Sequence, residues 1–176
     1  VNYLSNGVTC QGISNVVSII VNSIASGSIS APQILCPGSD PSALSIVNSP
    51  NGSGTLSYQW FSGSGVNGPW LPIGGQNTTS YDPPIINTNT YYQLTTTTTL
   101  NGNTCSAATS PILITIVTLT PGSIATNQTI CIGGDPTAFT TVAATTNNGA
   151  SISYQWQSSL DNVTWNNIVG ANAATY

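Results

Sequence analysis

The chain has 176 residues, 39% of them hydrophobic, and a formal net charge of −4, with no lysine, arginine or histidine. The lack of cationic side chains excludes nucleic-acid binding through phosphate neutralisation and attraction to an anionic membrane surface, and the lack of histidine excludes Ser–His and Cys–His catalytic pairs. No apolar run approaches the roughly 20 residues that span a bilayer, while the apolar content suits a globular core, so we expect a core without membrane insertion.

Short runs of β-branched and aromatic residues alternate with clusters of Gly, Pro, Asn and Ser along the whole chain, and this pattern predicts an all-β protein. Turn signals such as Pro37-Gly38 and Asn101-Gly102 separate the runs. No stretch has convincing helical periodicity. The predicted strands are, in chain order, 16–21, a short strand ending near Cys36, 43–47, 56–61, 70–73, 90–97, 112–118, 138–143 and 152–157.

The sequence repeats itself with an offset of 95 or 96 residues. LCPGSDPSAL at 35–44 returns as ICIGGDPTAF at 130–139, and SYQW at 57–60 returns at 153–156. A fixed period of this kind indicates an array of one structural unit. Seven or so short strands in each period match an immunoglobulin-like sandwich. We therefore predict tandem immunoglobulin-like β-sandwich repeats of about 95 residues.

The repeat divides the chain into three parts. Residues 1–24 are expected to form the C-terminal strands of a preceding repeat, residues 25–119 a complete repeat, and residues 120–176 the N-terminal half of a following repeat. Each incomplete part would expose unpaired backbone groups at its edges. Two explanations stay open. The chain is a piece of a longer polypeptide, or the N-terminal strands of one copy complete the C-terminal part of a neighbouring copy, and such head-to-tail exchange builds filaments.

Four cysteines are present, and neither a C-x-x-C motif nor histidine accompanies them, so a zinc site is not expected. Secreted chains use cysteine pairs as crosslinks. We expect a structural disulfide between Cys36 and Cys105, which would close a loop of about 70 residues, with Cys10 and Cys131 pairing outside this chain. Pairing of Cys10 with Cys36 and of Cys105 with Cys131 is an alternative, and free buried thiols are another, because connectivity does not follow from sequence.

The only charged side chains are four aspartates, and we expect no catalytic, metal-binding or cofactor-binding residue among them. Asp40, Asp82 and Asp135 each precede proline, and Asp161 precedes an asparagine. Aspartate at such positions commonly starts a turn. Acid–base catalysis needs two titratable groups close together, and calcium needs clustered carboxylates. The sequence therefore predicts that the chain is not an enzyme.

The aromatic residues recur with the repeat and divide into two groups. We expect Tyr58 and Trp60 in the SYQW of the complete repeat, and their counterparts Tyr154 and Trp156, to fill the cores. Trp70 and its counterpart Trp165 are flanked by polar residues. Exposed tryptophan can stack on sugars, so these two are the candidate glycan contacts.

The order of these motifs resembles a known family. In the complete repeat, Cys36-Pro37-Gly38, Ser57–Trp60, Tyr91-Tyr92 and Thr104-Cys105 follow one another, and Cys131 and Ser153–Trp156 repeat the first two. This arrangement resembles the tandem Ig-like/PKD-like repeats of very large secreted surface proteins of Bacteroidota, among them the gliding-motility adhesins of the SprB type. The resemblance implies export by the type IX system, display on the cell surface and no catalytic residues.

We therefore expect a non-catalytic segment of a long extracellular adhesin, located at the cell surface, that acts as a stalk or in multivalent adhesion. A subunit of a self-assembling filament and a carbohydrate-binding module are the alternatives. The expected partners are neighbouring repeats of the same chain, neighbouring copies or surface glycans, and neither nucleic acid nor inserted membrane is among them.

Overall fold

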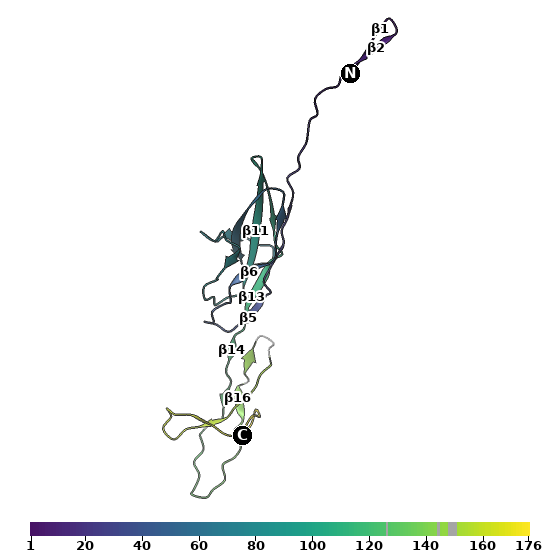
Figure 1. Cartoon of the computed structure of the whole chain (residues 1–176). Coiled ribbons are helices and arrows are strands. Elements are labelled where there is room, and N and C mark those ends of the chain that lie inside the picture. Colours follow the sequence, from purple (N-terminus) through teal and green to yellow (C-terminus); the bar gives the residue numbers. More distant parts are fainter. Residues whose placement is uncertain (126, 144, 148–150) are drawn as a thin grey trace.

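The structure is a computed structural model that describes residues 1–125, 127–143, 145–147 and 151–176 (Figure 1). Within these ranges every regular element is a β-strand, as the sequence predicts. The strands up to the end of the central part are β1 (Asn2–Ser5), β2 (Val8–Gln11), β3 (Ile24–Ala25), β4 (Ser28–Ile29), β5 (Gln33–Leu35), β6 (Leu44–Asn48), β7 (Asn51–Gly52), β8 (Thr55–Gly63), β9 (Trp70–Pro72), β10 (Ser80–Tyr81), β11 (Thr90–Leu100), β12 (Asn103–Ala108) and β13 (Ile112–Ile116). Six short strands follow: β14 (Leu119–Thr120), β15 (Ser123–Ile124), β16 (Thr141–Ala143), β17 (Thr146–Asn147), β18 (Gln157–Ser158) and β19 (Asn166–Asn167).

Residues 24–117 form a β-sandwich, here called the central unit. A three-stranded sheet with the order β10-β6-β4 packs against a larger sheet with the order β5-β13-β11-β8-β9, in which β12 also pairs with β11. All of these pairings are antiparallel except that of β5 with β13, which is parallel. This arrangement of two facing sheets is a β-sandwich, and it confirms the predicted all-β sandwich class.

The core of the central unit contains side chains from both sheets. Strand alternation decides which side chains are buried: on β11 every second residue from Tyr92 to Thr98 points inward and is buried, while the residues between them are only partly buried. On β13, Ile112, Ile114 and Ile116 alternate in the same way. The main buried cluster comprises Ile29, Leu44, Trp60, Tyr81, Tyr92, Leu94, Ile112 and Ile114.

The chain enters and leaves the central unit at opposite ends (Figure 1). At the entry, the Asn22 side-chain amide donates hydrogen bonds to the carbonyls of Thr98 and Asn103, at 3.2 and 2.9 Å, on the β11–β12 hairpin. At the exit, the N–H of Val117 donates to the carbonyl of Leu35 at 2.8 Å, one residue after β13 ends. Both connections are therefore fastened to the sandwich.

The N-terminal segment, residues 1–21, lies outside the sandwich. It begins with the hairpin β1–β2, and residues 12–21 are exposed and form no strand. This outcome corrects the prediction of a strand at 16–21. A strand needs a partner for its backbone groups, and the described residues offer none to this stretch.

The C-terminal segment, residues 119–176, contains only the strand pairs β14–β17, β15–β16 and β18–β19 in its described part. The strands predicted at 138–143 and 152–157 are therefore much shorter than expected, namely β16 and β18. In the central unit the equivalent strands pair with or pack against β11, and the C-terminal segment has no described strand in that place.

Backbone pairings recur along the chain with a constant offset. Ser28 pairs with Asn48 in β4–β6, and Ser123 pairs with Ala143 in β15–β16, each 95 positions later. The same offset relates β3–β7 to β14–β17, and β1–β2 to the end of the β11–β12 ladder. The C-terminal and N-terminal segments thus form the same local contacts as the matching parts of the central unit.

Candidate functional site

The tryptophan of the first SYQW lies in the centre of the sandwich. Trp60 is completely buried, its indole N–H donates to the Thr78 carbonyl at 3.0 Å, and its ring centroid lies 5.9 Å from that of Tyr81. Tyr58 is half-buried and packs against this cluster. Trp60 therefore belongs to the core, and Tyr58 lies at its edge.

The second SYQW lies in a less complete environment. Trp156 packs against Phe139 and Tyr176, with ring centroids 6.2 and 5.7 Å away, and its indole N–H donates to the Ala173 carbonyl at 2.9 Å. It is nevertheless only half-buried. Tyr154 is 37% exposed, which differs from the predicted core position. The reason is that no described strand covers this side of the C-terminal segment.

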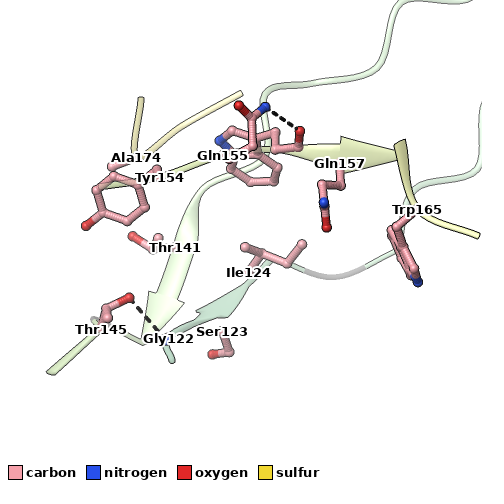
Figure 2. A pocket seen from close by; sticks show the side chains of 11 residues that line it. Gly122, Ser123, Ile124, Thr141, Thr145, Tyr154, Gln155, Gln157, Trp165 and Ala174 are labelled. Carbon is pink, nitrogen blue, oxygen red and sulfur yellow. Dashed lines mark hydrogen bonds between the residues drawn. The ribbon is translucent and has the colours of Figure 1, made fainter. Parts of the chain in front are cut away.

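The uncovered side forms a hollow of about 430 Å³ (Figure 2). Ile124 from β15 and Trp156 lie in its lining, and Tyr154 and Trp165 lie at opposite sides in this view. Ile124 is 56% exposed, whereas its counterpart Ile29 in the central unit is 8% exposed. Two of the residues that line the hollow, Ile124 and Trp156, therefore stand at the positions of the core residues Ile29 and Trp60 of the central unit.

The two candidate glycan contacts have different surroundings. Trp70 on β9 pairs with Gly63 on β8, which pairs with Tyr91 on β11, so the three lie in one row across the outer face of the larger sheet. A Cβ at Gly63 would lie 3.1 Å from the Trp70 ring, so this ring packs directly on the glycine backbone. Trp165 is 52% exposed. Trp70 thus has a structural role as the cover of Gly63 in addition to any surface role.

The four cysteines are free thiols, so the structure does not contain the predicted disulfide between Cys36 and Cys105 or the alternative pairs with Cys10 and Cys131. Cys36 follows β5, at the end of the sheet where β11 begins. Cys105 pairs with Thr98, near the other end of β11. The separation along the strands is about 30 Å at 3.4 Å per residue, whereas a disulfide needs Cα atoms within about 7 Å.

The aspartates lie in exposed turns and loops of the described chain. All four are exposed, and the described residues contain no group of three or more potential metal ligands. Asp161 accepts hydrogen bonds from the N–H groups of Val163 and Thr164, at 2.9 and 2.8 Å, and these bonds hold the pKa of its carboxyl well below the usual range. Asp161 is therefore a turn-forming residue, as its position in the sequence predicts.

The most strongly perturbed groups in the core are tyrosines. Burial raises the pKa of Tyr92 to about 12, with a further contribution from Tyr81, whose own pKa burial also raises. The rings of these two residues lie 5.8 Å apart. Burial therefore favours the neutral phenol of Tyr92 in the core.

Two features were not identified in the sequence. The first is Asn22, whose counterpart 95 positions later is Val117, so the repeat gave no signal for the anchor. The second is the burial of Thr96 and Thr98 inside the sandwich, which a run of five threonines does not suggest. Thr98 accepts a hydrogen bond from the Gly54 N–H at 2.9 Å, while the Thr96 hydroxyl has no partner among the described residues.

Comparison with known proteins gives one match. The family described as a domain of unknown function, DUF8696, matches residues 25–118 and 120–176. No curated protein and no solved structure matches the chain. Among the described residues no helix has the length and apolar character needed to cross a membrane. Because the matched residues make up most of the sequence, the chain belongs to the DUF8696 family.

Proposed function

We propose that the chain is a non-catalytic segment of a long secreted adhesin at the cell surface, in which β-sandwich units joined in series form a stalk and present many weak contacts. The recurrence of the same strand ladders 95 positions apart carries this proposal. Contacts that are weak one at a time add through effective concentration when one chain holds many of them.

The geometry of the central unit suits a serial spacer. Because the chain enters at one end and leaves at the other, each unit adds its full length to the array (Figure 1). β11 has 11 residues, so a unit extends by about 37 Å at 3.4 Å per residue. Only Val117 and Thr118 lie between β13 and β14, and a joint this short limits bending between units.

The charge pattern also supports the proposal of an extracellular stalk. With no lysine or arginine the chain offers no trypsin cleavage site, and with four exposed aspartates it carries no attraction for nucleic acid. The resemblance to SprB-type surface repeats points to the same location, with gliding motility and type IX secretion as the corresponding process and route.

The experiment is surface labelling of intact cells that produce the protein, with an antibody against the central unit and a cytoplasmic protein as the control. Labelling without permeabilisation, and weaker attachment of cells that lack the gene, are the expected results. Labelling that requires permeabilisation would contradict the proposal.

A second candidate is weak carbohydrate binding on the outer face of the larger sheet. The row of Trp70, Gly63 and Tyr91 supports it, because two aromatic rings flank a position without a side chain. Binding of the full chain to a glycan array that is lost in Trp70→Ala but kept in Trp165→Ala is the expected result. An array on which the wild-type chain binds no glycan would remove this candidate.

A further inference from the structure

The segment that enters the central unit and the strand that leaves it meet in one short ladder. β5 belongs to the entering segment and β13 is the last strand, and the two pair in parallel, with Gln33 opposite Ile114 and Leu35 opposite Ile116. The other strands of the entering segment, β3 and β4, pair with β7 and β6 instead. Among the described strand pairings, β5–β13 is therefore the one that joins the two ends of the central unit directly.

The direction of the two strands determines how a pull along the chain acts on this ladder. The chain enters at the end that Asn22 anchors and leaves at the opposite end, after Val117 (Figure 1). β13 runs toward the exit, and β5 runs the same way because the pairing is parallel. A pull on the chain draws β5 back toward the entry and β13 out through the exit. The strands must then slide past each other, so the evenly spaced bonds of the parallel ladder are loaded together.

The last residues of β13 are held on both sides. On one side the Val117 N–H, just past the end of β13, donates to the Leu35 carbonyl at 2.8 Å. On the other side the Ile116 N–H donates to the side-chain oxygen of Asn89 at 2.8 Å. Asn89 lies directly before β11, which pairs with β13 along this side. Its side chain therefore lengthens the β11–β13 ladder to the level of Ile116, the last residue of β13 that pairs with β5.

β5 is also fastened to the segment that leads into the smaller sheet. The Gln33 side-chain amide donates to the Ser42 carbonyl at 2.8 Å, and its oxygen accepts from the Ser42 N–H at 2.9 Å. Ser42 lies just before β6 of the three-stranded sheet. Gln128 makes the same two hydrogen bonds with Thr137, at 2.7 and 2.9 Å. β5 is thus tied to both sheets, and the tie recurs in the following repeat.

The ladder lies on both routes by which a pull opens the unit from its ends. β13 leaves through the exit only after it separates from β5, and the entering segment leaves through the entry only after β5 separates from β13. Sliding also displaces core side chains, because Ile114 is completely buried and Ile116 is 4% exposed. A slip by one residue would turn both of them toward the opposite face of the sheet. The β5–β13 ladder is therefore the contact that resists tension.

We propose that the β5–β13 ladder, braced by Asn89 and Gln33, is a mechanical clamp that keeps the unit folded while the array is under tension. In the proposed adhesin, tension arises between the cell and the surface to which the chain attaches, so the inference rests on the proposed function for the source of the load. The clamp itself is a property of the central unit. Forced unfolding is governed by the unfolding rate rather than by the equilibrium free energy. The direction of a pull therefore changes the unfolding force without any change in stability.

The experiment stretches one variant of the full 176-residue chain in two directions. Cys10→Ser, Cys105→Ser and Cys131→Ser together leave Cys36, which is exposed and directly follows β5, as the attachment point. A pull between tags at the two termini makes the ladder slide. A pull between Cys36 and the C-terminal tag acts on the same end of both strands, so the bonds open one after another. We expect an unfolding force several times lower in the second direction at the same pulling speed.

Two matched pairs of substitutions test the brace and the end of the ladder. Asn89→Ala removes the acceptor of the Ile116 N–H, and Asn87→Ala makes the same change at a neighbouring exposed asparagine. Val117→Pro removes the N–H that donates to β5, and Thr118→Pro places the proline one residue beyond the ladder. Between the terminal tags we expect a lower unfolding force in Asn89→Ala and Val117→Pro, and the wild-type force in Asn87→Ala and Thr118→Pro.

Two outcomes would overturn the inference. One is an equal unfolding force in the two directions, which are compared within a single variant, and the other is an equal effect of the two substitutions in each matched pair. The cell-surface location is tested separately. Loss of the direction dependence together with labelling of intact cells would leave the proposed function standing. Labelling that requires permeabilisation, together with a direction-dependent force, would contradict the proposed function and retain the clamp.

Discussion

The hydroxyl groups of two buried threonines on β11 give a sharp test of the sandwich register. Thr96 and Thr98 are both completely buried. The Thr98 hydroxyl accepts the Gly54 N–H at 2.9 Å, whereas the Thr96 hydroxyl has no partner among the described residues. Thr→Val at either position keeps the shape of the side chain and removes only its hydroxyl.

We predict that only one of the two substitutions destabilises the protein. Thr98→Val leaves the Gly54 N–H without a partner, at a cost of about 1–3 kcal/mol in the free energy of unfolding. Thr96→Val removes a buried polar group that makes no hydrogen bond, so it should be neutral or stabilising by about 1 kcal/mol. With a urea dependence of about 1–3 kcal/mol per molar, the Thr98→Val midpoint should fall by about 1 M.

The assay is urea unfolding of the full chain followed by the fluorescence of Trp60, the fully buried tryptophan of the central unit. The half-buried and exposed tryptophans contribute a sloping baseline that the two variants share. Equal losses in the two variants, or a larger loss in Thr96→Val, would refute the reasoning, because the hydroxyl of residue 96 would then be the bonded one.

Three further predictions follow from burial, ionisation and thiol geometry. Ile114→Ala should lower the free energy of unfolding by about 2–5 kcal/mol, because Ile114 is completely buried. Ile19 stands at the matching repeat position but is 89% exposed, so Ile19→Ala should change the free energy of unfolding by less than about 0.5 kcal/mol. Equal effects of the two substitutions in urea unfolding would contradict the assignment of the core. The pKa of Tyr92 is raised to about 12 from 10.0, so the stability due to its neutral phenol is complete below pH 10 and is lost as the pH rises toward 12. Alkaline unfolding should therefore begin above pH 10 and be less steep in Tyr92→Phe, and an unchanged slope would count against this group. All four cysteines are free, so a thiol reagent should label four groups in the unfolded chain without prior reduction, and reductant should leave the melting temperature unchanged; a fall in melting temperature on reduction would indicate a disulfide.

The alternation of side chains predicted the sheets of the central unit but not which strands find partners. Ile112, Ile114 and Ile116 alternate, and β13 is buried as that pattern indicates. The same alternation at Val17 and Ile19 predicted a strand, and those side chains are exposed. The alternation within a short stretch of sequence indicates that one face of a strand prefers to be buried. It does not indicate whether another segment of the protein packs on that face, because that segment is distant in the sequence.

The candidate site was also predicted only in part, because local sequence does not determine which distant segments pack together. The local sequence SYQW places Trp60 in a core, and its repeat leaves Tyr154 37% exposed because the covering strands are not among the described residues. The cysteine spacing suggested a disulfide, but the separation of Cys36 from Cys105 is set by the length of β11, which the number of residues between the two cysteines does not reveal. The run of five threonines at 95–99 alternates between the two faces of β11, and this alternation buries the side chains of Thr96 and Thr98.

The central claim is that the chain contains one closed sandwich in series with segments of the same unit that are open. Stretching single full-length chains between their termini tests it most directly. The account predicts one main unfolding event with a contour-length gain of roughly 300 Å, because residues 24–117 form the one closed unit among the described residues and an extended chain spans about 3.3–3.6 Å per residue. A single event that releases roughly 600 Å, the length of the entire chain, would contradict it.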